Sequence, residues 1–78
     1  KLIRIYPNPA GDHINIDFNS TNKDCQLKVF SSEGTVLITL STAANKNRID
    51  ISELAPGLYF LNVSDSDGHF ATYRFSKQ

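Results

Sequence analysis

The residue types that carry most protein chemistry are few in this 78-residue sequence, and they are widely separated. His13, Cys25 and His69 are the soft metal-ligand types, and each stands alone in its own segment. Zinc sites usually take their ligands in closely spaced pairs, such as C-x-x-C or H-x-x-x-H. The spacing therefore favours a histidine on a polar face, a small core cysteine and a histidine in a turn over a metal site.

Oxygen ligands and nucleophiles also form incomplete patterns. The tetrapeptide DSDG at 65–68 is similar to the start of a calcium loop, but the twelfth position holds Ser76 where a glutamate is needed. We find no G-x-S-x-G motif, no carboxylate pair with acid–base spacing and no glycine-rich phosphate loop. The sequence predicts no enzyme, no cofactor and no bound metal, and a hairpin turn explains DSDG.

The charge pattern argues against two further classes of partner. Eight basic and eight acidic residues give a formal net charge of zero, and the basic residues are scattered along the chain. Nucleic-acid binding normally needs a basic stripe, and acidic membrane surfaces attract basic clusters. No apolar run approaches the roughly 18–20 residues of a membrane-spanning helix. We therefore expect neither nucleic-acid binding nor direct membrane insertion.

Alternation of apolar and polar residues is the dominant signal along the chain, and it indicates short β-strands. Seven strands are expected, at Leu2–Tyr6, Asp12–Phe18, Cys25–Ser31, Thr35–Ser41, Arg48–Ile51, Leu58–Ser64 and Phe70–Ser76. The segments between them are rich in turn residues: PNPAG, NSTNK, SSEG, TAANKN, LAPG and DSDG. This spacing predicts an all-β antiparallel sandwich, with residues 1–78 as a single domain.

Local chemistry predicts more detail at several positions. Pro7 and Pro9 end the first strand, and Asn8 between them suits a turn that moves the chain to the other sheet. Gly34, Gly57 and Gly68 are expected to supply positive φ angles in turns. The segment ISELAPG can form a single helical turn with Ser52 as its cap. The aromatic residues of the last two strands are expected to fill the core; they are Tyr59, Phe60, Phe70, Tyr73 and Phe75.

Taken in order, these segments resemble a known family. The chain has YPNPAGDHINI at its start, SSEG in the middle, then ISELAPGLYFLNV and SDSDGHFATYRFSKQ. Together they resemble the C-terminal sorting domain of the type IX secretion system, in its commoner A form (the Por secretion family), from Ile5 to Lys77. The YPNP opening, the L-x-x-G-x-Y segment at Leu54–Tyr59 and the basic–aromatic ending at Arg74–Lys77 carry most of the likeness.

This resemblance implies a seven-stranded, immunoglobulin-like sandwich that is not an enzyme. It implies a tag read by the outer-membrane translocon, a shuttle protein and a sortase, which directs an attached cargo through the periplasm to the cell surface or the medium. The family's closing segment often has Lys at the position of Arg74 and a larger apolar residue at that of Ser76. We assign partner recognition to Pro7, Asn8, Pro9, Gly57, Tyr59, Gly68, Arg74, Phe75 and Lys77, with the tail 74–78 and the Pro7–Pro9 corner as one surface.

Two other readings stay open. The same sandwich architecture serves carbohydrate-binding or adhesion domains of secreted enzymes, so the fold alone does not separate a sorting tag from a binding module. For Pro7, Asn8 and Pro9, a purely structural turn explains the residues as well as recognition does. Unpaired strand edges would also allow a dimer.

Overall fold

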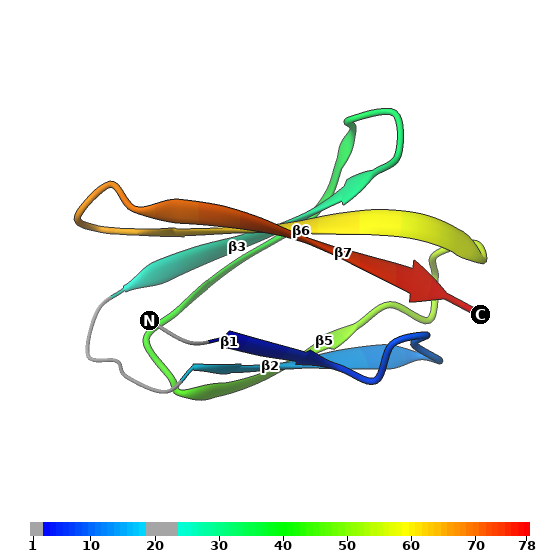
Figure 1. Ribbon diagram of the computed structural model, residues 1–78, viewed down its shortest axis with the longest axis horizontal. Helices are drawn as coiled ribbons and strands as arrows, with labels where there is room; N and C mark the ends of the chain where they lie inside the picture. The colour runs from blue at the N-terminus through cyan, green and yellow to red at the C-terminus, as the bar shows by residue number, and fades with distance from the viewer. Residues whose placement is uncertain (1–2, 19–23) are drawn as a thin grey trace.

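The computed structural model describes residues 3–18 and 24–78, and it is built of two packed antiparallel sheets (Figure 1). The smaller sheet has the order β1-β2-β5 and the larger has the order β4-β3-β6-β7. The strands are β1 (Ile3–Tyr6), β2 (His13–Phe18), β3 (Cys25–Ser31), β4 (Val36–Thr42), β5 (Lys46–Asp50), β6 (Gly57–Asp65) and β7 (Phe70–Lys77). The predicted all-β sandwich is confirmed, and strand bounds differ from expectation by two residues or fewer. Leu2 and the whole NSTNK turn, residues 19–23, lie outside the described residues.

The core lies between the sheets and follows the alternation of the sequence. In β2 every second residue is buried, and β3 and β6 show the same period of two. Side chains of alternating residues point to opposite faces of a sheet, so each apolar series faces the other sheet. The buried residues are Ala10, Ile14, Ile16, Phe18, Cys25, Leu27, Val29, Ile49, Ile51, Tyr59, Leu61, Val63 and Phe75.

Most of the turns behave as their chemistry predicts. Gly34, Gly57 and Gly68 all have positive φ. The segment after β5, however, forms a turn and no helix: Leu54 N–H donates to the carbonyl of Ile51. Asp50 caps this turn, because its carboxylate accepts the Ser52 N–H at 2.8 Å. Ser52 is therefore the capped residue, and the cap is Asp50, two residues earlier than expected.

Two expectations about burial were wrong. Phe70 is 76% exposed, and Phe60 is half-buried on the face of β6 opposite to Tyr59 and Leu61. Both residues occupy the outward phase of the alternation, and that phase outweighs the general tendency of aromatic residues to be buried. Only Tyr59 and Phe75 of the five aromatic residues lie in the core, with Tyr73 packed against its margin.

The part of the chain that the structure describes contains no helix, and therefore none long and apolar enough to cross a membrane.

Candidate recognition surface

The corner between β1 and β2 is bonded to the end of the chain. Asn8 Oδ1 accepts the N–H of Ser76 at 3.1 Å. Ala10 N–H donates to the carbonyl of Ser76 at 2.7 Å, and Gln78 N–H donates to the carbonyl of Ala10 at 2.8 Å. Ala10 and Lys77 thus form a short parallel bridge between the corner and β7. The corner of the small sheet and the tail of the large sheet make one continuous surface, at the end marked C in Figure 1.

The sequence of the corner explains this junction. Pro7 and Pro9 have no N–H to donate, so neither can continue the ladder of β1. Asn8, exposed between them, uses its side-chain oxygen in place of a backbone acceptor. Ala10 then supplies a donor and an acceptor to the edge of β7 and is itself fully buried. The expectation that this turn moves the chain to the other sheet was wrong: PNPAG returns the chain from β1 to its neighbour β2 within the small sheet, and only its hydrogen bonds reach the large sheet. The segment thereby also covers the last residues of an otherwise open edge.

Phe75 and Tyr59 anchor the tail from inside. The two residues lie opposite each other in the β6–β7 ladder, and their rings stack with centroids 5.8 Å apart. Both are buried, and the hydroxyl of Tyr59 also donates to the carbonyl of Ala55. Because neighbouring residues in a strand face opposite sides, burying Phe75 turns Arg74 and Ser76 towards solvent. Tyr59 and Phe75 thus position the surface and are inaccessible to a partner.

The predicted recognition residues divide by position. Eight of them meet at the corner end of the sandwich, where Gly57 lies opposite Lys77 in the ladder. Exposed among these eight are Pro7, Asn8, Pro9, Gly57 and Arg74, and Lys77 is half-buried. Gly68 is at the other end of the β6–β7 hairpin, in the turn between the strands. The structure brings Gly68 near none of the others, so its role is that of a turn residue.

Arg74 ends a row of apolar residues that sequence reasoning missed. Arg74 lies opposite Phe60, Phe60 lies opposite Phe30, and Phe30 lies opposite Val36. The row crosses all four strands on the outer face of the large sheet. The sequence did contain a signal for this row: Phe60 stands between Tyr59 and Leu61, which face inward, so strand alternation turns Phe60 to the outer face. Aromatic residues and arginine are the types most enriched at the energetic centres of protein interfaces.

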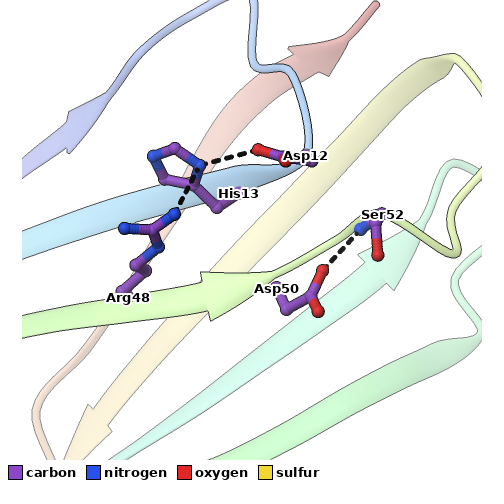
Figure 2. A network of polar contacts seen from close by, with 5 residues as sticks. All are labelled: Asp12, His13, Arg48, Asp50 and Ser52. Atoms are coloured by element: carbon purple, nitrogen blue, oxygen red, sulfur yellow. Dashed lines mark hydrogen bonds and ion pairs between the residues drawn. The ribbon is translucent and has the colours of Figure 1, made fainter.

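A polar network on β2 and β5 holds one of the two histidines (Figure 2). His13 Nδ1 lies 2.8 Å from Asp12 Oδ1 and 3.3 Å from an Arg48 nitrogen. An Nδ1 that carries hydrogen donates to Asp12, whereas an Nδ1 without hydrogen accepts from Arg48, so the tautomer of the ring decides which of the two contacts is a hydrogen bond. The hydrogen bond with His13 lowers the pKa of Asp12 below its ordinary value. Figure 2 shows the Asp50–Ser52 contact separately from this group. The imidazole of His13 contacts only Asp12 and Arg48 among the five residues drawn.

A second polar group lies on the outer side of the small sheet. Tyr6 donates its hydroxyl proton to Asp17 Oδ2 at 2.9 Å, and Lys46 Nζ lies 3.5 Å from the same oxygen. The hydrogen bond to Asp17 raises the pKa of Tyr6 above its ordinary value. The guanidinium of Arg4 lies over the Tyr6 ring, 4.9 Å from its centroid. These contacts join β1, β2 and β5 across the solvent face of the sheet and include no acid–base pair with a nucleophile.

The opposite end of the sandwich contains an apolar cavity of about 360 Å³. Ile3, Phe18, Val63 and Tyr73 line it, with His69 from the β6–β7 turn and Phe70 from the start of β7. The nearby Asp65 carboxylate accepts the N–H groups of Asp67 and His69, at 2.9 and 3.0 Å. The DSDG segment is thus a hairpin turn, as predicted. Among the described residues, no three His, Cys, Asp or Glu side chains gather closely enough to hold a metal ion.

The solved structures that share the fold include the following two. One is PorZ, an essential bacterial surface component of the type-IX secretion system of Porphyromonas gingivalis, with a TM-score of 0.80 and 21% identity. The likeness covers 97% of this chain, which spans 11% of the PorZ chain. The other is a DUF3244 family protein from Bacteroides vulgatus with an immunoglobulin-like β-sandwich fold, with a TM-score of 0.83 and 15% identity. That likeness covers 97% of this chain and 83% of the other. These likenesses establish that the sandwich is of the immunoglobulin-like type.

No curated protein sequence matches the chain. The family model described as "Secretion system C-terminal sorting domain" matches residues 4–76, from the second residue of β1 to the last residue but one of β7. The chain therefore belongs to the family of type IX secretion C-terminal sorting domains, which mark proteins for export across the outer membrane to the cell surface or the medium.

Proposed function

We propose that residues 1–78 act as a single export tag, and that the secretion machinery reads the surface formed by the Pro7–Pro9 corner and the tail 74–78. The contact that carries the proposal is the one between Asn8 and Ser76, which holds the tail against the corner. A tag must present the same shape whatever cargo precedes it, and a tail bonded to the rest of the domain meets that need. The partners would be the translocon, a shuttle protein and a sortase.

Recognition in this proposal depends on Arg74 and Lys77. Arg74 is exposed beside the row of Phe60, Phe30 and Val36, so a partner can contact a charge and apolar surface together. A planar guanidinium donates five hydrogen bonds and also stacks on aromatic groups. Proteins of this kind act by being bound, and we propose no catalytic step for the domain.

The test fuses residues 1–78 to a periplasmic reporter in a bacterium that has a type IX system and measures the reporter outside the cell. Deleting the tail is a poor test, since it removes the buried Phe75 and the bonds that hold Ala10. The double variant Arg74→Ala/Lys77→Ala keeps both and should reduce export several-fold. Lys28→Ala/Lys46→Ala, which removes two positive charges elsewhere, is the matched control. Undiminished export of the first variant would exclude the tail from recognition.

A carbohydrate-binding role is the second candidate, and the observation that favours it is Phe70. This ring is exposed at the rim of the apolar cavity, at the end opposite to the tail. Exposed aromatic faces beside polar groups suit the apolar face of a sugar ring. Binding to a glycan array that disappears in Phe70→Ala would support this role. Binding that is unchanged in Phe70→Ala would exclude this site.

A further inference from the structure

We propose that the free edge of β4 pairs with β4 of a second copy of this chain, antiparallel about a two-fold axis. The two four-stranded sheets would then form one continuous sheet of eight strands. The proposal is independent of the export function, and the surface involved is the opposite edge of the large sheet from β7.

Three of the four edge strands carry features that hinder pairing with another chain. An edge strand exposes unpaired N–H and C=O groups, and proteins protect such edges with short strands, prolines, charges or covering segments. β1 has four residues and is followed by two prolines. β5 carries three charges in five residues, and β7 carries two charges and is covered at its end by the corner.

β4 has no charge, no proline and, among the described residues, no covering segment on its free side. Its one irregularity is a bulge at its start, opposite Val29 and Phe30, which leaves residues 38–42 in regular register. Its sequence, VLITLST, contains no charged residue and no proline. Val36, Leu37 and Leu40 are 47%, 41% and 36% exposed, and they make up three of the five large hydrophobic residues found exposed in the described part of the chain. The turn end of the β3–β4 hairpin also projects beyond the two layers in Figure 1. The open edge and the exposed apolar residues are therefore on the same strand.

The chemistry of this edge fits a second copy. The free backbone groups require an extended strand, and the uncharged side chains favour one that is itself uncharged and apolar. β4 meets both conditions, and a net charge of zero gives no long-range repulsion between copies. An axis at Thr39, the middle residue, lies within the regular part of β4 and places Ile38 opposite Leu40 of the second copy. Both residues lie on the core side, since their β3 partners are the buried Val29 and Leu27.

The nearest charges do not oppose this arrangement. Lys28 lies beside Thr39 in the ladder, so in the dimer the two copies of Lys28 are three strand spacings apart. At about 4.8 Å per spacing the separation is roughly 14 Å. This exceeds the screening length of about 8 Å at physiological salt, so the repulsion between them is weak.

The test measures the mass of the folded domain against concentration by sedimentation equilibrium. Thr39→Lys should weaken the dimer by about fivefold, because like charges directly opposite destabilise a strand pair. Thr39→Glu should weaken it similarly, and an equimolar mixture of the two variants should restore it as a mixed dimer. Thr72→Lys is the matched control: Thr72 is an exposed threonine in the same row across the sheet, on the opposite edge strand. It should leave the dimer unchanged.

Recovery in the mixture separates strand pairing from a simple loss of folding, since two misfolded variants would not rescue each other. A domain that stays monomeric up to about 1 mM, the weakest association of interest, overturns the proposal. So does a dimer that Thr72→Lys weakens as much as Thr39→Lys, because the contact would then lie elsewhere.

Discussion

The side chain of Asn8 accepts a hydrogen bond from the backbone of Ser76, 68 residues further along the chain. This contact joins the turn that leaves the first strand to the end of the last strand. With the paired bonds of Ala10, it connects the two sheets of the sandwich at the surface that we assign to recognition.

Removing the Asn8 side-chain oxygen should loosen the tail and cost little overall stability. We expect Asn8→Ala to lower the free energy of unfolding by about 1 kcal/mol, the typical worth of one hydrogen bond, as measured by urea denaturation. Asn45→Ala, an exposed asparagine in the β4–β5 turn, is the control and should change little. Amide exchange at Ser76 should also accelerate in Asn8→Ala. An unchanged exchange rate would mean that Asn8 does not hold the tail.

Two phenylalanines of the same strand should behave in opposite ways. Phe75 is 1% exposed and stacks on Tyr59, so Phe75→Ala should cost about 3–5 kcal/mol and leave the domain largely unfolded. Phe70 is at the rim, and Phe70→Ala should change the free energy of unfolding by no more than about 0.5 kcal/mol. Thermal denaturation of the two variants, compared with the unchanged protein, measures both losses of stability. Equal losses would contradict the inward and outward positions described for β7.

Stability should fall on acidification, and two aspartates should account for part of the fall. The pKa of Asp12 is lowered by its hydrogen bond with His13, and that of Asp50 by the Ser52 N–H, each from an ordinary value of 3.8. A carboxylate with a lower pKa in the folded state stabilises the fold above the unfolded pKa, and this contribution is lost as the pH falls through the folded pKa.

The contribution of Asp12 and Asp50 to the free energy of unfolding should therefore decrease as the pH falls from just above 4. Asp12→Asn/Asp50→Asn should show a shallower decline of the unfolding free energy across this interval, measured by urea denaturation in a pH series. Asp24→Asn, a third exposed aspartate, serves as the control. A decline as steep in the double variant as in the unchanged protein would mean that other groups govern acid sensitivity.

We expect Gly68 to be required only for the backbone conformation of its turn, and not for contact with a partner. Its φ is +89°, a conformation that side chains with a Cβ rarely adopt, although open space surrounds the site. We expect Gly68→Ala to cost about 1–2 kcal/mol of unfolding free energy. Gly11→Ala, also in open space but without a positive φ, should be nearly neutral. Export of the reporter fusion should be normal for Gly68→Ala wherever the domain stays folded, since Gly68 is remote from the tail.

Most of the fold could be predicted because its signals are local. The alternation in HINIDF and CQLKVF decides which side chains face inward, and glycine or proline at a turn limits the backbone within a few residues. The errors were also local conflicts: Phe60 and Phe70 were assigned to the core by residue type, whereas the phase of their strands turns them outward. Likewise Asp50 and Ser52 are both good caps, and only the path of the chain selects Asp50.

The sequence by itself determined seven strands, the inward phase of most of them and the family. Tertiary structure alone decided that Asn8 meets Ser76 and that Arg74 ends an apolar row. It also decided that Gly68 lies at the far end and that the uncharged strand β4 is at an edge of its sheet. The physical reason is that strand alternation is set by neighbours two residues apart. The order of strands in each sheet depends on hydrogen bonds between segments far apart in the chain, and no local pattern encodes those bonds.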